Sequence, residues 1–203
     1  KIFIDIGANK GLYTKYLLSK LDYIECHLFE PSKYNSQILK DSFSSKGKVK
    51  INELGLSNVN SRTKLFSDKS GSTLASLTKR RLEHLDIEML FEEEVVIKRF
   101  DNYWENKDNL IDYVKIDVEG HELDVLEGFG ELIKNTKLIQ FEFGGCNIDT
   151  KTFFQDFWYF FTQNDFDIFR ITPKGFIQIK NYSEQDEYFI TTNYIALNKK
   201  FIK

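Results

Sequence analysis

The chain has 203 residues, of which 41% are hydrophobic and 29% are charged, ordinary values for a globular protein that exclude a disordered or collagen-like chain. Its 28 Lys and Arg residues nearly balance its 31 Asp and Glu residues, and the net charge of −3 argues against a dedicated nucleic-acid binder. Two widely separated cysteines fit a reducing compartment, and no apolar stretch reaches the ~20 residues that cross a bilayer, so we expect a cytoplasmic protein without a membrane span.

The length fits one domain over residues 1–203. Because the sequence opens at Lys1 without Met and enters a strand-like run at once, we expect a further segment before it. Short apolar and β-branched runs alternate with helical spacing, which is typical of βαβ units and a parallel sheet. In the first part of the chain, strands are predicted over 2–6, 23–30, 48–54 and 62–66, and helices over 11–21 and 31–42. The strand at 62–66 is expected to pair across the turn-forming residues 57–61.

The alternation continues after a predicted loop at 67–77. Residues 79–90 have helical spacing, and their basic start, Lys79-Arg80-Arg81, is interpreted as a solvated helix face. Further strands are predicted over 94–100, 112–118, 138–143, 167–172, 176–179 and 188–197, and further helices over 101–106, 121–127 and 152–164.

The first predicted strand leads directly into a helix through the sequence Asp5-Ile6-Gly7-Ala8-Asn9-Lys10-Gly11. Such a strand-turn-helix setting is typical of nucleotide pockets, where glycines let the backbone approach a ligand. Gly7 permits the tight turn, Gly11 lets the helix start close to the sheet, and Asp5 can bind a ligand or hold the loop. The spacing GxxxG lacks the middle glycine of the dinucleotide fingerprint, which favours S-adenosylmethionine, a cofactor without a pyrophosphate.

Glu30 ends the second predicted strand, 23 positions after Gly7. This is near the ~20-residue offset at which an acidic residue meets a ribose in such folds. We therefore predict that the Glu30 carboxylate accepts hydrogen bonds from both ribose hydroxyls of the cofactor.

A third motif spans residues 114–122, where a buried strand ends in carboxylates and a histidine. Ligands of open α/β sheets lie beyond the carboxyl ends of strands, so Asp117 is expected to point into the pocket. His121 follows at the start of a helix, and an imidazole with an ordinary pKa near ~6.5 is suited to accept a hydroxyl proton. We predict that His121 is the base, oriented by Asp117 or Glu119. Glu142, late in a later strand, is a second candidate for a carboxylate that faces the molecule carrying this hydroxyl.

The same three residues, Asp117, Glu119 and His121, also allow a metal site, since carboxylate and imidazole suit Mg, Mn or Fe. No second histidine or recognised ligand pattern accompanies them, and we predict no metal.

In this order and spacing, the motifs resemble the FkbM family of S-adenosylmethionine-dependent methyltransferases. The segments that carry the resemblance, through about residue 145, are Phe3 to Thr14, Phe29-Glu30-Pro31, Gly55-Leu56-Ser57-Asn58, Ser70 to Leu74 and Ile116 to Glu122. The resemblance implies an α/β, Rossmann-like class I methyltransferase fold, with a seven-stranded, mostly parallel sheet and a C-terminal antiparallel hairpin. Residues 176–197 fit that hairpin.

The resemblance also implies O-methylation of a hydroxyl on a sugar, glycan or small natural product, with S-adenosyl-L-methionine as cofactor. It places Glu30 at the ribose, Leu56 and Ser57 at the adenine, and the following at the methionine part: Asp5, Gly7, Asn9 and Gly11. The cofactor set is completed by Ala8, Pro31 and Asp117, with Ser72 and Thr73 as weaker candidates. The catalytic set is His121, Asp117 and Glu119.

Other functions stay open at this point. One is methylation of RNA or protein, although the single basic triplet gives little signal for a nucleic-acid partner. Another is a catalytically silent module that keeps the nucleotide pocket. A nicotinamide-dependent oxidoreductase is disfavoured by the GxxxG loop. The expected partner is a small-molecule or glycan acceptor.

Overall fold

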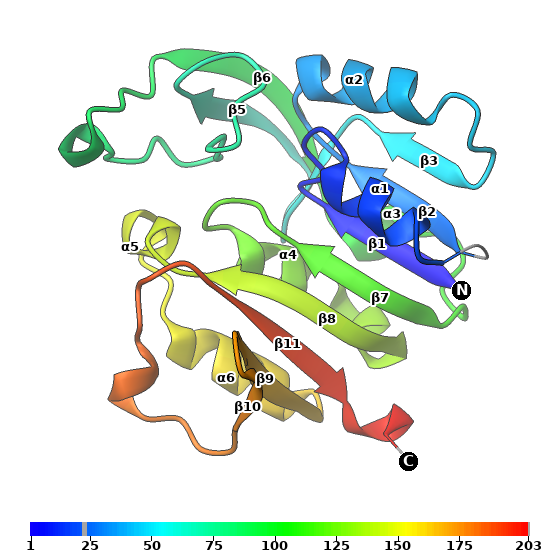
Figure 1. Cartoon of the computed structure of the whole chain (residues 1–203), viewed down its shortest axis with the longest axis vertical. Helices are drawn as coiled ribbons and strands as arrows, with labels where there is room; N and C mark the ends of the chain where they lie inside the picture. The colour runs from blue at the N-terminus through cyan, green and yellow to red at the C-terminus, as the bar shows by residue number, and fades with distance from the viewer. Residues whose placement is uncertain (22–23, 203) are drawn as a thin grey trace.

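The computed structural model describes residues 1–21 and 24–202, and its main feature is an eight-stranded sheet of order β10-β9-β11-β8-β7-β1-β2-β3 (Figure 1). Neighbouring parallel strands make up one side of it: β3 (Val49–Asn52), β2 (Glu25–Phe29), β1 (Ile2–Ile6), β7 (Ile111–Ile116) and β8 (Thr136–Phe143). The antiparallel side consists of β11 (Thr192–Asn198), β9 (Phe166–Thr172) and β10 (Gly175–Ile179). The predicted Rossmann-like α/β arrangement is confirmed.

The antiparallel side differs from the prediction in one strand and in its pairing. The family resemblance implies a seven-stranded sheet that ends in an antiparallel hairpin within residues 176–197. Instead, β10 pairs with β9, and β11 lies between β8 and β9, so β10 is an eighth strand at the edge. Only two residues connect β9 to β10, and such a short connection makes consecutive strands pair directly. Tyr194 and Ala196 of β11 are fully buried, as suits a strand flanked on both sides.

Helices cover the sheet on both faces (Figure 1). On one face, α1 (Leu12–Leu18) and α2 (Lys33–Phe43) pack over β1, β2 and β3, with Phe3, Leu28 and Leu39 in the interface. The other face carries α3 (Phe100–Tyr103), α4 (Glu122–Gly128), the 3-10 segment η2 (Gly130–Asn135) and α6 (Phe154–Gln163). Its core is rich in phenylalanine, and the rings of Phe141 and Phe157 stack with centroids 5.0 Å apart. This packing fixes the strand ends on which the site is built.

A second sheet has the order β4-β6-β5 and consists of β4 (Gly55–Leu56), β6 (Phe91–Lys98) and β5 (Ser61–Ser67). The sequence predicts a strand at 62–66 that pairs across the turn at 57–61, but β5 pairs with β6, far along the chain. In Figure 1 this sheet and the loop that joins β5 to β6 lie toward the side at which β7 and β8 end. Residues 68–90 thereby reach the carboxyl ends of the central strands.

The prediction of a helix over residues 79–90 is wrong. Within that range the chain forms only one 3-10 turn, η1 (Glu83–Leu85), followed by Asp86 in the left-handed conformation with φ 56°. The apolar positions do not share one buried face, since Leu82 is buried whereas Leu85 is 58% exposed. In addition, the Arg81 backbone N–H donates to the Asp149 carboxylate, which holds this segment in an extended path.

The remaining predicted elements are present with ends shifted by a few residues. The predicted strand at 23–30 begins at Tyr23, which lies outside the described residues. Short elements that have no periodicity were missed: β4, η2, α5 (Cys146–Thr150), η3 (Glu184–Asp186) and η4 (Lys199–Phe201). Among the described residues, no helix combines the length and apolar character that a bilayer crossing needs.

Candidate functional site

A pocket of about 600 Å³ opens at the carboxyl ends of β1, β2, β7 and β8. Its walls come from the loop after β1, the end of β2, the turn after β7 and the segment that joins β5 to β6. Leucines at its rim include Leu12 and Leu85, both largely exposed. The volume suits a nucleotide-sized ligand, and the place is where open α/β sheets bind theirs.

The loop after β1 depends on glycine at two points. Gly7 has φ 77°, and a Cβ there would lie 1.9 Å from the backbone oxygen of Asp117, so only glycine lets the loops after β1 and β7 approach this closely. Gly11 has φ 73°, and a Cβ there would lie 2.7 Å from both Leu39 and Phe43 of α2. Of the residues predicted to contact the methionine part of the cofactor, Gly7 and Asn9 line the pocket and Gly11 does not.

Asp5 lies beneath this loop and outside the pocket lining. It accepts a hydrogen bond of 2.5 Å from the Thr14 hydroxyl of α1, and its other oxygen is 3.8 Å from the Lys115 ammonium. Burial raises the pKa of Asp5, and Lys115 opposes that shift. Of the two predicted roles for Asp5, the structure gives it the loop-holding one.

Glu30 is buried at the end of β2 and lines the pocket. One carboxylate oxygen accepts the Asn9 backbone N–H at 2.8 Å, and the other accepts the Ser32 backbone N–H at 2.9 Å. Burial raises the pKa of Glu30 to about 7, and these two N–H groups oppose the rise. The Asn35 side chain also hydrogen-bonds to this carboxylate. The part of the carboxylate that faces the pocket remains for a ligand hydroxyl.

Some of the residues predicted to lie near the adenine line the pocket, and one does not. Leu56 and Pro31 line the pocket beside Glu30. Ser57 is buried outside the lining, and its backbone N–H donates to the Lys98 carbonyl oxygen, which joins β4 to β6. Ala8 of the first loop, like Ser72 and Thr73 of the segment after β5, lies in the lining.

The turn after β7 is organised by Glu122, a residue that sequence reasoning assigned no role. Its fully buried carboxylate accepts backbone N–H groups of Val118 and Gly120. Burial raises the pKa of Glu122 to about 8, although those N–H groups lower it. The turn also holds Glu119 in the left-handed conformation, with φ 56°. This geometry leaves Asp117 and Glu119 in the pocket wall.

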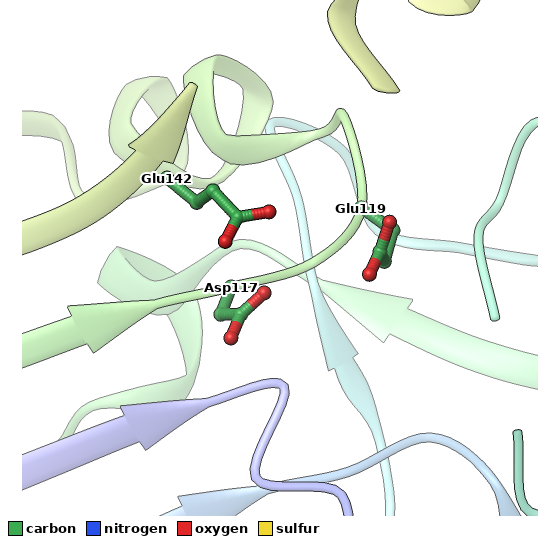
Figure 2. A group of neighbouring side chains, drawn as sticks. All are labelled: Asp117, Glu119 and Glu142. Carbon is green, nitrogen blue, oxygen red and sulfur yellow. The ribbon is translucent and has the colours of Figure 1, made fainter. Parts of the chain in front are cut away.

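Three carboxylates gather there, from Asp117, Glu119 and Glu142, each offering an oxygen within 4.8 Å of the others (Figure 2). Asp117 accepts a hydrogen bond of 3.0 Å from Lys115, and Glu119 forms an ion pair with Arg80. Oxygen atoms so arranged could coordinate a hard cation, but two of the three carboxylates already have a cationic partner. The group differs from the trio weighed for a metal in the sequence, because Glu142 takes the place of His121.

His121 lines the pocket with both ring nitrogens engaged. Its Nδ1 is 2.7 Å from the Asp124 carboxylate one helical turn later, and its Nε2 is 2.9 Å from the Thr78 hydroxyl. The prediction that Asp117 or Glu119 orients His121 is therefore wrong. The reason is local, since His121 caps α4 and its ring turns along the helix toward Asp124.

Arg80 is a pocket residue that the sequence analysis misread. Its neighbours Lys79 and Arg81 are exposed as expected, but the Arg80 side chain is only 9% exposed and pairs with Glu119. Its Nε also lies 3.5 Å from an Asp149 oxygen. The sequence contained one signal for this role, because several carboxylates at the ends of β7 and β8 need a cationic partner when they are buried. That signal does not identify which arginine is the partner.

The chain is similar in sequence to one known family of proteins. The sequence model of the methyltransferase FkbM domain matches residues 5–168. No curated protein matches the sequence.

Solved structures share the fold at low identity. An rRNA methylase from Streptococcus thermophilus has a TM-score of 0.52 and 10% identity over 98% of this chain and 86% of that one. A protein described as a caffeoyl-CoA O-methyltransferase from Staphylococcus aureus has 0.51 and 14%, over 98% and 76%. A Streptococcus mutans protein in complex with S-adenosylhomocysteine (SAH) has 0.50 and 8%, over 97% and 87%. The predicted class I methyltransferase fold is confirmed.

Proposed function

The chain belongs to the FkbM methyltransferase family and takes S-adenosylmethionine (SAM) as its cofactor, and on this premise we propose that it methylates a hydroxyl oxygen of a sugar, glycan or small natural product. The family supplies the reaction class, and the pocket supplies the arguments for a hydroxyl acceptor.

The pocket residues fit this cofactor. Glu30 would accept hydrogen bonds from the ribose hydroxyls, the Gly7 loop would take the methionine part, and Leu56 with Pro31 would flank the adenine. The crowding at Gly7, where no Cβ fits, leaves backbone rather than side chain at the floor of this half of the pocket. When bound, the cofactor supplies an already activated methyl group on sulfur.

The observation that carries the hydroxyl acceptor is the setting of His121. A carboxylate only accepts hydrogen bonds, so Nδ1 donates to Asp124, and Nε2 of the neutral ring keeps the lone pair that faces Thr78. The Thr78 hydroxyl now donates to that lone pair. An acceptor hydroxyl that takes the place of Thr78 would give its proton to Nε2, with Asp124 stabilising the imidazolium.

Positioning is expected to contribute more than proton transfer. Effective molarities of well-oriented reactants reach ~10⁵ to 10⁸ M, whereas a general base adds about 10² to 10⁴ in rate. The rim leucines Leu12 and Leu85 would exclude water, and the carboxylates at the strand ends would orient acceptor hydroxyls. His121 would then supply the smaller share of the rate increase.

The test is a screen with SAM carrying a labelled methyl group. Monosaccharides, oligosaccharides and hydroxylated natural products are compared with RNA and with protein mixtures, and the site of methylation is read by mass spectrometry. We expect methyl ethers on hydroxyl compounds only. Label in RNA or protein, with none in hydroxyl compounds, would contradict the proposal.

The role of His121 is tested on the acceptor that the screen finds. His121→Ala is expected to lower turnover about 10² to 10⁴-fold with unchanged SAH affinity. Asp124→Asn is expected to act in the same direction but less. Near-normal turnover of His121→Ala across pH 6 to 9 would show that another group takes the proton.

A further inference from the structure

Glu142 is the last but one residue of β8, opposite Asn193 of β11 and next to Asp117 (Figure 2). Its side chain lines the pocket, and within residues 1–21 and 24–202 it has neither a hydrogen bond nor a salt bridge. The other carboxylates of the group are different, because Asp117 is paired with Lys115 and Glu119 with Arg80. Glu142 is thus the carboxylate of this group whose charge no neighbouring cation balances directly.

A carboxylate removed from water without a partner is unfavourable unless a cation arrives or the group takes up a proton. Burial raises the pKa of Glu142 to about 7, and repulsion from Asp117 and Glu119 adds to the rise. The cations Lys115 and Arg80 oppose it from β7 and from the segment after β5. From α5, the Cys146 thiol also feels this charge, but burial keeps its pKa well above the ordinary value and it stays neutral.

We propose that Glu142 recognises the positive charge of the methyl donor, so that the pocket binds SAM, a sulfonium cation, more tightly than SAH, the neutral thioether left after transfer. The argument is one of charge balance in the pocket. Asp117 and Glu119 have their cations in the protein, whereas Glu142 has none, and the methyl donor is the permanent cation that this reaction must bring in. Once the methyl group has left, that charge is gone, and the pocket favours release of the product.

The inference concerns the cofactor and does not depend on which acceptor is methylated. If the hydroxyl acceptor proposed above is wrong, SAM and SAH must still bind, so the two ideas fail separately. The distinguishing readout is binding, which needs no acceptor.

Binding of the cation is expected to be linked to a proton. A positive charge near Glu142 favours its ionised form, so SAM binding at pH 7 should release a proton from this carboxyl group, while SAH binding should not. The sign follows from the free pocket, in which Glu142 is mostly protonated at pH 6 and mostly ionised at pH 8. The preference for SAM over SAH should therefore rise with pH, by about fivefold between pH 6 and 8 if the cation lowers the pKa by about one unit.

The experiment is titration calorimetry of SAM and of SAH with the whole chain, at pH 6, 7 and 8, in two buffers of different ionisation enthalpy. Glu142→Gln keeps the shape and removes the charge, and Glu131→Gln, at a side chain 87% exposed on η2, is the matched control. We expect Glu142→Gln to reduce the preference for SAM about tenfold at pH 8 and to weaken its pH dependence, of which Glu119, with a pKa that is also about 7, keeps a part. Glu131→Gln should match the unmodified chain. Proton exchange by the ligand's own amine is removed by comparing the variants.

Glu142→Gln is expected to fold, because no hydrogen bond is lost, and thermal unfolding checks this. Should it not fold, the unmodified chain alone decides. A preference for SAM that stays constant from pH 6 to 8, an unchanged preference in Glu142→Gln, or failure of the unmodified chain to bind either compound would each overturn the proposal.

Discussion

Replacing Glu30 by glutamine separates the cost of burying a charge from the value of its hydrogen bonds. The pKa of this carboxyl group is raised from 4.5 to about 7 by burial, so the folded chain binds its proton more tightly than the unfolded chain. Its ionisation therefore opposes folding. The penalty is absent below pH 4.5, grows toward pH 7 and is complete above that, at roughly 3 kcal/mol.

The substitution also removes a hydrogen bond. The carboxylate accepts the backbone N–H groups of Asn9 and Ser32, and a glutamine carbonyl can accept only one of them while its NH₂ group faces the other. Leaving that N–H without an acceptor costs roughly 2 kcal/mol. Combining both effects, Glu30→Gln should be about 1 kcal/mol less stable than the unmodified chain at pH 5 and about 1 kcal/mol more stable at pH 8.

Urea unfolding followed by circular dichroism at pH 5 and pH 8 measures this crossover. Other carboxyl groups titrate in the same range, but they are present in both chains and cancel in the difference. SAH affinity, measured in parallel by calorimetry, should fall tenfold or more, which is about 1.4 kcal/mol, because the glutamine NH₂ group cannot accept from a ribose hydroxyl. A stability difference of one sign at both pH values would refute this account of Glu30.

Two further substitutions test the packing of the site by thermal or urea unfolding. Gly7→Ala should destabilise the chain by more than about 2 kcal/mol, because it adds a Cβ against a backbone oxygen at a residue with positive φ. The control is Gly47→Ala, whose Cβ meets nothing within 4 Å and which should change stability by less than about 0.5 kcal/mol. Equal effects of the two substitutions would be inconsistent with the close approach at Gly7. Arg80→Met should lower the free energy of unfolding by roughly 2 to 4 kcal/mol at pH 8 and by less at pH 6, because it removes the cation that pairs with Glu119, whose pKa burial already raises to about 7. Arg81→Met, at the exposed neighbour, should leave the stability nearly unchanged. An equal loss of stability in both variants would mean that the buried pair is unimportant.

Local sequence signals were sufficient to place the loops after β1, β2 and β7 at one pocket. The turn at Gly7, the acidic strand end at Glu30 and the run through Asp117 each lie at a fixed offset from a regular element, and the parallel sheet brings strand ends together whatever the details of the loops. Periodicity also placed the central strands to within a few residues.

The rest of the pocket depends on contacts between distant segments, which no local pattern encodes. The segment at 79–90 has helical spacing but is drawn out by pairing of Arg80 with Glu119, 39 positions away. Sequence alone could not identify the partner of His121, because Asp117, Glu119 and Asp124 each lie within four positions of it. Only the geometry of the helix selects Asp124. The order of β11, β9 and β10 likewise depends on connection length and burial together.

The crossing from β5 to β6 has a consequence for how this enzyme could change its acceptor. The ends of β1, β2 and β7 supply one part of the pocket lining, and the segment between β5 and β6 brings Leu77, Arg80 and Leu85 to it. That segment begins and ends in the second sheet, and Ser76, Thr78 and Arg80 tie it to the turn after β7. We expect acceptor choice to follow this segment. An exchange of residues 68–90 between relatives should therefore keep Thr78 and Arg80, whose partners lie after β7, and vary the other positions.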